Sequence, residues 1–217
     1  MLKSIGALII FFCLIYFSFD SFAESKMGKA RLFLGSTQTK PEELNTDLTA
    51  QSLKEATLNN SFGVEITFPF SDRFNAGLRY AKRVISQDEV NGSSVTDYRV
   101  AIDQDIMAAI GRYLFYKGDI FNVDAVLGVG IGNSKYEIKS ATQDGSMTKQ
   151  GSSYSMGGIG VSIGSGKYHF LMEAGYDSQK LSDFKETGTL NGNISSIDLS
   201  GPYFTIGFLF DGIPISM

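Results

Sequence analysis

The residues from Ile197 to Phe210, IDLSGPYFTIGFLF, decide the fold of this chain. In their second half Phe204, Ile206, Phe208 and Phe210 share one parity, whereas Tyr203, Thr205 and Gly207 share the other. A β-strand directs alternate side chains to opposite faces, so one face of this strand is strongly apolar. A soluble sheet would bury that face in a core. A transmembrane barrel would turn it to lipid and use the smaller face to line a narrow lumen.

The same alternation recurs in seven segments before this one, so the sequence predicts eight strands in all. The seven are 30–36, 61–68, 74–85, 98–116, 120–138, 153–164 and 168–177. The connections are alternately long (37–60, 86–97, 139–152, 178–196) and short (69–73, 117–119, 165–167). This pattern predicts an all-β fold, an eight-stranded antiparallel up-and-down transmembrane β-barrel with short periplasmic turns and long extracellular loops. Within 37–60, Leu44, Leu48 and Leu53 predict one short helix.

The face opposite the apolar one is rich in glycine and carries isolated charges, which suits a narrow lumen. Buried charges need partners, so we expect a structural ion-pair network in the lumen, formed by Arg31, Glu65, Arg79, Asp124 and Glu173. The open alternative is a gate whose pairs exchange. In 98–116 the parity breaks: Val100 and Ile102 fall on the lipid parity, but Met107, Tyr113 and Phe115 do not. We expect either a bulge between Asp105 and Tyr113 or a different register.

The ends of the strands supply two further expectations. Aromatic residues gather there and predict girdles at the two membrane surfaces: Tyr80, Tyr113, Phe115, Tyr116, Phe121, Tyr168, Tyr176 and Tyr203. Three long connections contain the dipeptides Asn91-Gly92, Asp144-Gly145 and Asn191-Gly192, which favour tight hairpin turns. We therefore expect strands 3–4, 5–6 and 7–8 to protrude past the membrane as hairpins. Irregular polar loops are the alternative.

The first residues have the pattern of an export signal. Lys3 precedes an apolar run from Ile5 to Phe19, and Ser21-Phe22-Ala23 places small residues before a cleavage site. We expect residues 1–23 to be a signal peptide and 24–217 to be the barrel domain. The rival, a membrane anchor, would need about 20 apolar residues. Cys13 is the only cysteine, so the mature chain would have no disulfide. The net charge of −4 gives no electrostatic case for binding nucleic acid.

The stretch from Asp198 to Phe208, DLSGPYFTIGF, resembles the closing strand of the small eight-stranded outer-membrane barrels. This family includes the OmpA transmembrane domain, OmpX and the opacity adhesins, and as a strand pattern the resemblance covers residues 28–210. Many members end on the aromatic residue, whereas DGIPISM follows Phe210 here. The resemblance implies a bacterial outer-membrane location. It also implies contact with outer-membrane lipids and lipopolysaccharide, assembly by the barrel-assembly machinery, and an extracellular ligand that the sequence does not identify.

The motifs of this family specify a fold and a membrane and hardly specify an activity. The leading hypothesis is a non-enzymatic protein that is structural or adhesive at the cell surface through its loops. A narrow channel for small solutes is the alternative, and a lipid-A-modifying enzyme comes third. His169, the only histidine, shows no His–Ser–acid pattern, so no catalytic residue is predicted. Gly128–Gly132 and Gly157–Gly160 do not fit a phosphate loop, so no cofactor is predicted. Asp103 and Asp105 share one strand face, but a cation site would want more oxygen ligands, so we predict no metal.

Overall fold

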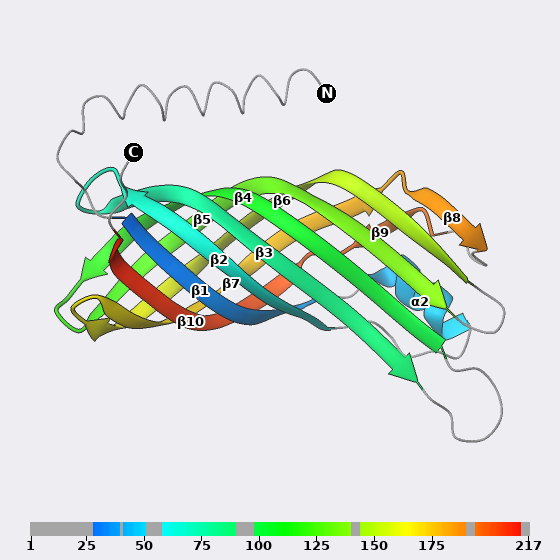
Figure 1. Ribbon diagram of the computed structural model, residues 1–217, viewed down its shortest axis with the longest axis horizontal. Helices are drawn as coiled ribbons and strands as arrows, with labels where there is room; N and C mark the ends of the chain where they lie inside the picture. Colours follow the sequence, from blue (N-terminus) through cyan, green and yellow to red (C-terminus); the bar gives the residue numbers. More distant parts are fainter. Residues whose placement is uncertain are drawn as a thin grey trace, which may run out of the picture.

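The computed structural model describes residues 28–39, 41–50, 58–89, 98–139, 144–189 and 194–213. The expected signal peptide, residues 1–23, lies outside this part of the chain. The described residues form ten strands and one helix, drawn in Figure 1: β1 (Gly28–Gln38), α2 (Glu42–Ala50), β2 (Leu58–Pro69), β3 (Phe74–Glu89), β4 (Tyr98–Lys117), β5 (Phe121–Lys139), β6 (Asp144–Ser165), β7 (Tyr168–Ser182), β8 (Lys185–Thr189), β9 (Ser196–Asp198) and β10 (Gly201–Ile213). None of these residues forms a helix long and apolar enough to cross a membrane.

The strands close into one antiparallel barrel. Each strand from β1 to β7 pairs with the next in the chain, and β10 lies between β7 and β1 and closes the sheet. β8 extends β7 in the same register along β6, since Gln179 lies opposite Tyr154 and Lys185 opposite Thr148. β9 likewise extends β10 along β7. The wall of the barrel therefore consists of eight continuous strand positions, which we call staves: β1 to β6, β7 with β8, and β9 with β10. The predicted fold is confirmed.

Interruptions within two staves explain why ten strands make eight. β7 and β8 are separated at Asp183, whose φ of 55° lies in the left-handed region that a strand cannot use. The predicted closing strand, 197–210, is interrupted only at Leu199 and Ser200, and the Leu199 N–H still donates to the Gln179 carbonyl at 2.9 Å. The last stave therefore keeps its register from β9 to β10.

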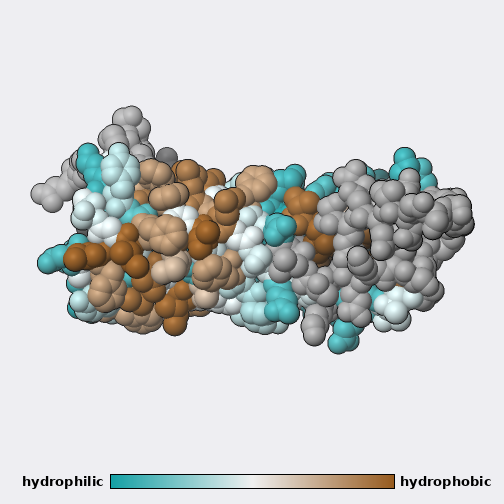
Figure 2. Space-filling view, turned by 90° about the horizontal axis from the view of Figure 1, so that it is seen from below, coloured by the Kyte–Doolittle hydropathy of each residue, from teal (hydrophilic) through white to brown (hydrophobic). Residues whose placement is uncertain are grey.

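The outer face of the barrel carries an apolar band near the ends where β1 begins and β10 finishes. Figure 2 shows these side chains gathered over one half of the barrel. Leu34 and Leu127, for example, are 63% and 71% exposed, which a soluble protein would avoid over so wide a surface. Along β7 the band runs from Tyr168 to Tyr176, nine residues, which matches one membrane crossing of about 9–11 residues.

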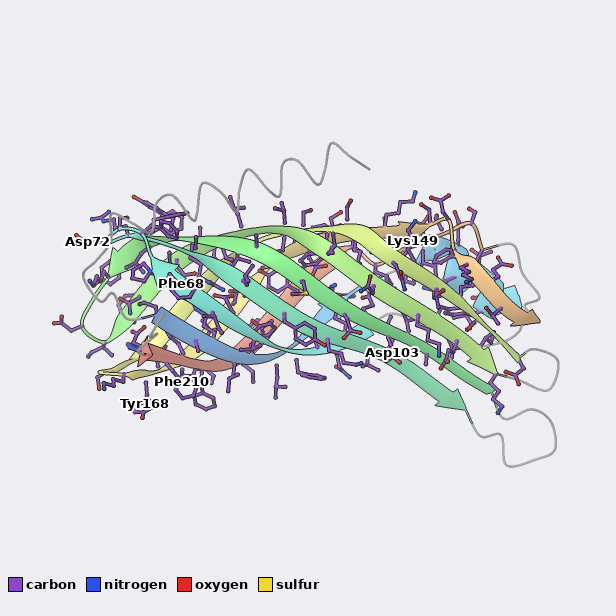
Figure 3. The ribbon with its side chains drawn as sticks, turned by 45° about the horizontal axis from the view of Figure 1, so that its top comes forward. Phe68, Asp72, Asp103, Lys149, Tyr168 and Phe210 are labelled. Atoms are coloured by element: carbon purple, nitrogen blue, oxygen red, sulfur yellow. The ribbon has the colours of Figure 1, made fainter. Side chains whose placement is uncertain are left out.

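Several staves continue well beyond this band. β4, β5 and β6 contain 20, 19 and 22 residues, roughly twice the length of a crossing. Figure 3 shows Phe68, Tyr168 and Phe210 toward the end that carries the Asp72 turn, with Asp103 and Lys149 far along the barrel toward the other end. We call the part that carries the apolar band the membrane half, and the part beyond it the outer half.

The structure changes the register expected for β4. Its even-numbered residues point inward, and Val100 and Ile102 are almost completely buried inside the outer half rather than facing lipid. The expected bulge between Asp105 and Tyr113 is absent, because β4 pairs regularly with β3 throughout that stretch. The irregularity instead lies between Leu114 and Tyr116, near the periplasmic turn.

The protruding hairpins β3–β4 and β5–β6 are present, but the turn of the second is not where it was expected. β7 pairs with β9 only as far as Ser182, and beyond it β8 pairs with β6. β3 and β4 stay paired as far as Glu89 and Tyr98, and β5 and β6 as far as Lys139 and Asp144. Asp144-Gly145 belongs to β6, so the turn predicted at this dipeptide is wrong. The other two dipeptides, at 91–92 and 191–192, lie outside the described residues.

Candidate functional site

Six charged side chains meet inside the membrane half, each from a different strand. They are the three arginines Arg31, Arg79 and Arg112 and the three carboxylates Glu65, Asp124 and Glu173, and we call them the charged cluster. No side chain of the cluster is more than 5% exposed. The numbers of positive and negative charges are equal, so each buried ion can be compensated within the cluster.

Arg112 is the centre of the charged cluster. Its Nε and Nη2 donate to Glu65 Oε1 and Oε2 at 2.6 and 2.8 Å, and its Nη1 donates to Asp124 Oδ1 at 2.6 Å. Its Nη2 also donates to Glu173. Arginine can do this because its guanidinium presents five donors in a rigid fork, which suits several carboxylates at once.

Arg79, on the neighbouring strand β3, and Arg31, on β1, complete the charged cluster. Arg79 donates from Nε to Glu65 Oε2 at 2.9 Å and from Nη2 to Glu173 Oε1 at 2.9 Å. Arg31 Nη2 donates to Asp124 Oδ2 at 3.1 Å, and Arg31 Nε lies 3.3 Å from Glu65 Oε1. The five charged residues expected in the lumen thus lie within one connected set of ion pairs.

Sequence reasoning missed Arg112 and misplaced Tyr203. Arg112 is on the inward parity of β4, so a correct register for that strand would have added it. Tyr203, expected in a girdle, points inward and donates from its hydroxyl to Glu173 Oε1 at 3.1 Å. Gly158 and Gly175 lie beside its ring, where a Cβ would collide with the tyrosine. The other residues expected in the girdles are exposed on the outer face.

Two polar layers follow toward the outer half. In the first, Arg83 donates to Asp177 and also, at 3.3 Å, to the Tyr154 hydroxyl. In the second, Gln104 Nε2 donates to Gln179 Oε1 at 3.0 Å, and Gln179 Nε2 donates to Ser152 Oγ at 2.7 Å. Arg83 and Asp177 come from opposite walls, on β3 and β7. Gln104 on β4 reaches Gln179 on β7, so both layers bridge the lumen.

The outer half has an apolar core of its own, inside the barrel wall. Its buried members are Leu44, Leu48, Ile85, Val100, Ile102, Tyr136, Ile138, Met147, Leu181, Ile197 and Leu199. α2 contributes the first two, and both are completely buried. Of the leucines that predicted this helix, Leu53 lies outside the described residues. Glu43, in the first turn of α2, accepts hydrogen bonds from the backbone N–H groups of Ser196 and Ser195 at 2.8 and 3.1 Å.

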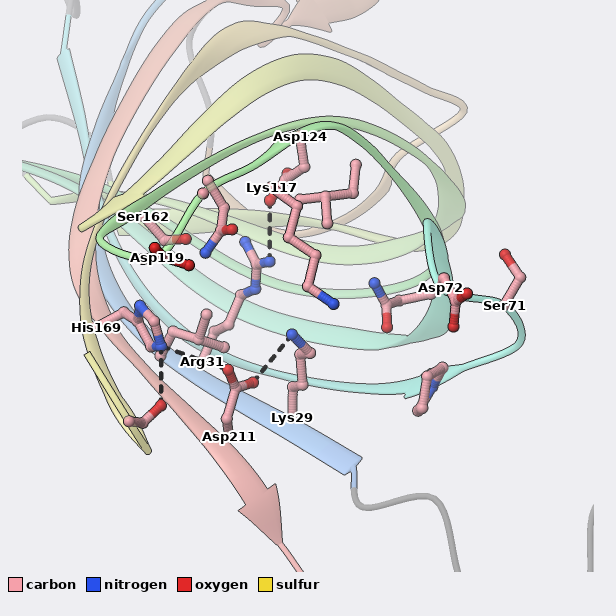
Figure 4. A pocket seen from close by; sticks show the side chains of 17 residues that line it. Lys29, Arg31, Ser71, Asp72, Lys117, Asp119, Asp124, Ser162, His169 and Asp211 are labelled. Carbon is pink, nitrogen blue, oxygen red and sulfur yellow. Dashed lines mark hydrogen bonds and ion pairs between the residues drawn. The ribbon is translucent and has the colours of Figure 1, made fainter. Parts of the chain in front are cut away.

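The periplasmic end is hollow. A cavity of about 510 Å³ opens there, and we call it the vestibule. Figure 4 shows its walls, which include Lys29, Arg31, Lys117, His169 and Asp211. Arg31 and Asp124, which belong to the charged cluster, line its inner end.

The remaining candidates from the sequence are isolated. Asp103 and Asp105 lie on the outward parity of β4, and Asp105 Oδ1 accepts a hydrogen bond from the Tyr80 hydroxyl at 2.6 Å. No group of three or more His, Cys, Asp or Glu in the described part of the chain is arranged to hold a metal. His169 points inward, with Nε2 at 3.2 Å from the Gly166 carbonyl and 3.5 Å from Asp211 Oδ2. The two glycine-rich stretches lie in strands β5 and β6, which are not phosphate-binding loops.

Two solved structures to which this chain is similar are outer membrane proteins. The chain matches the outer membrane protein OprG of Pseudomonas aeruginosa at a TM-score of 0.53 and 16% identity, covering 88% of this chain and 97% of that one. It matches a major outer membrane protein of Thermus thermophilus at 0.50 and 9%, covering 85% and 99%. No protein-family model and no curated protein matches the sequence. The fold and its apolar band define the class: a small eight-stranded outer-membrane β-barrel.

Proposed function

We propose that this protein is a non-enzymatic component of the bacterial outer membrane that acts, structurally or as an adhesin, through its outer half. The observation that carries the proposal is the filled interior. Ion pairs, the polar layers and the apolar core with α2 follow one another along the lumen. A pore for solutes needs a continuous polar path, and a close-packed apolar core in the lumen interrupts such a path.

The outer half supports a role in surface contacts. Loops that merely join strands need no core, yet here α2 and six strands bury one together above the membrane. A rigid protruding surface loses less conformational entropy on binding than free loops would, which favours contact with a partner. Outer-membrane lipids, lipopolysaccharide and the barrel-assembly machinery remain the expected partners within the membrane.

Conductance tests the closed lumen. Purified barrel in planar bilayers is expected to give no current steps, and flotation with vesicles provides the control that it has inserted. Steps that scale with the amount of protein would favour the narrow channel instead. Mass analysis of lipid A with and without the protein addresses the enzyme: a new lipid A species would contradict the proposal.

Surface attachment separates the adhesive from the structural role. Cells that display the wild type are compared with cells that display a variant in which a tight turn replaces residues 136–147. This deletion leaves the pairs Lys135–Thr148 and Ser134–Lys149 in place and shortens only the outer half. Loss of attachment in the variant would support adhesion. Equal attachment with increased sensitivity of the cells to detergent would support the structural role.

A further inference from the structure

The vestibule is open at one end only. It opens at the periplasmic end and stops at the charged cluster. Its volume of about 510 Å³ lies within the range of about 300–1,000 Å³ typical of small-molecule sites. A purely structural barrel does not need such a cavity. The polar groups that line the vestibule without a partner therefore indicate which ligand it would bind.

The vestibule contains unpartnered nitrogen groups from three strands, and two of them are donors. Arg31 Nη1 is buried and has no hydrogen-bond partner among the described residues. His169 Nδ1 also has none there, but it is an acceptor in the neutral ring, because Nε2 faces the Gly166 carbonyl and carries the hydrogen. Lys117, at the end of β4, makes no ion pair within the described part of the chain, and Figure 4 shows its side chain directed into the cavity. A buried donor without a partner is costly, so a ligand that accepts hydrogen bonds would be favoured here.

The aspartates that line the vestibule differ in position and in pairing. Asp124 is paired with Arg31 and Arg112, and Asp211 Oδ1 lies 3.1 Å from Lys29 Nζ. Asp72 and Asp119 belong to exposed turns at the mouth. The inner wall therefore presents the unpaired donor of Arg31, while Asp124 and Asp211 already lie beside cations. A cation would find no cluster of acidic ligands there.

We propose that the vestibule binds a small oxyanion, a phosphate or carboxylate group of a periplasmic solute. Lys117 supplies a positive charge at the mouth, and Arg31 supplies a fixed donor further in, beside the His169 ring. Asn122 and Ser162 line the same cavity and offer further polar groups. Because the charged cluster closes the inner end, the ligand is held and not conducted.

His169 gives a direct reporter, because it is the only histidine of the chain. In an untagged refolded barrel the NMR signal of the imidazole Hε1 proton therefore comes from His169 alone. The probes are inorganic phosphate and, separately, succinate. We expect the signal to shift and saturate as either is added at constant pH and ionic strength. Saturation with phosphate alone supports a phosphoryl solute, and saturation with both supports oxyanions generally.

Lys117→Ala should weaken the apparent affinity about tenfold, as loss of a charge-assisted hydrogen bond would do. Lys135→Ala is the matched control, since Lys135 is an exposed lysine of the outer half that pairs with Glu137. Arg31→Lys keeps the charge but removes Nη1, and should also weaken binding. A shift that stays linear in concentration, an unchanged affinity in Lys117→Ala, or saturation by Ca²⁺ instead of either anion would overturn the proposal.

Discussion

The two halves of the barrel have opposite polarity. In the membrane half, apolar side chains face outward and the interior holds six charged residues. In the outer half, the interior is an apolar core and the outward residues are largely polar. The backbone is the same continuous sheet in both halves, so the surroundings decide which face is apolar. Apolar side chains are favourable against lipid and unfavourable against water.

β5 shows the change within a single strand. Its outward residues run from Leu127, Val129 and Ile131 in the band to Lys135 and Glu137 beyond it. Its inward residues run the other way, from Asp124 in the charged cluster to Tyr136 and Ile138 in the apolar core. The even-numbered residues of β5 stay inward all along the strand, although its pairing with β6 shifts between Gly132 and Ser134. The exchange of polarity in β5 is therefore made by its sequence alone. A parity rule that equates apolar with outward therefore holds only up to the membrane surface.

The largest effect is expected from breaking the charged cluster. Arg112→Ala leaves three carboxylates short of a partner and should lower the free energy of unfolding by about 3–5 kcal/mol. Arg79→Ala should cost less, because Arg79 contacts two carboxylates and Arg112 contacts three. Urea unfolding from vesicles, followed by far-UV circular dichroism, measures both. An Arg112→Ala midpoint equal to wild type would show that the cluster does not stabilise the membrane half.

A charge placed on the outward face tests where the lipid ends. Leu127→Arg puts a cation on the apolar band and should cost about 2–4 kcal/mol near the membrane centre. Glu137→Arg lies on the same strand and the same parity, but in the outer half, so it should cost at most about 1 kcal/mol. The same unfolding assay compares them. Equal losses would mean that the boundary between the two halves is misplaced.

The apolar core of the outer half should be weaker than the membrane half. Leu48→Ala removes a completely buried side chain of α2 and should cost about 2 kcal/mol, the low end for such changes, because a short helix can shift into the space. Hydrogen exchange of the α2 amides measures the loss locally. Thr49→Ala, on the exposed side of the helix, is the control. If both variants exchange alike, α2 does not depend on this core.

This polarity also explains what could be predicted from the sequence. The strands, their order and the five charged lumen residues follow from alternation, because the membrane half obeys one rule throughout. The same rule, carried into the outer half, places Val100 and Ile102 on the lipid face, although apolar residues point inward there. With the parity of β4 reversed, Arg112 is lost from the predicted network.

The outer half resists prediction for a second reason: its core is assembled from distant segments. Leu44 and Leu48 indicate a helix, but nothing local shows that they pack against Leu181 and Ile197, which are more than 130 positions away. The two continuations, β8 after β7 and β10 after β9, depend on cross-strand register, which alternation alone does not reveal. Likewise, the vestibule arises only when three short turns and both ends of the sheet come together.

The smallest effect concerns the contact between α2 and β9, and it should depend on pH. Hydrogen bonds, chiefly from the Ser196 N–H and also from the Ser196 and Ser195 hydroxyls, hold the pKa of Glu43 below its ordinary value of 4.5. A lowered pKa means that the folded state favours the carboxylate. The stabilisation is therefore complete above about pH 4.5 and is lost as the pH falls through the lower pKa of the folded protein.

Protection of the Ser195 and Ser196 amides, corrected for their intrinsic exchange rates, should fall roughly severalfold between about pH 5 and pH 3. Glu43→Gln keeps the size of the side chain but cannot ionise, so its protection should be lower at pH 5 and nearly independent of pH. The effect must be small because the carboxylate lies at the surface, where water competes for the same hydrogen bonds. If wild type and Glu43→Gln lost protection in parallel, other groups would control this contact. The junction of α2 with β9 would then depend on the apolar core alone.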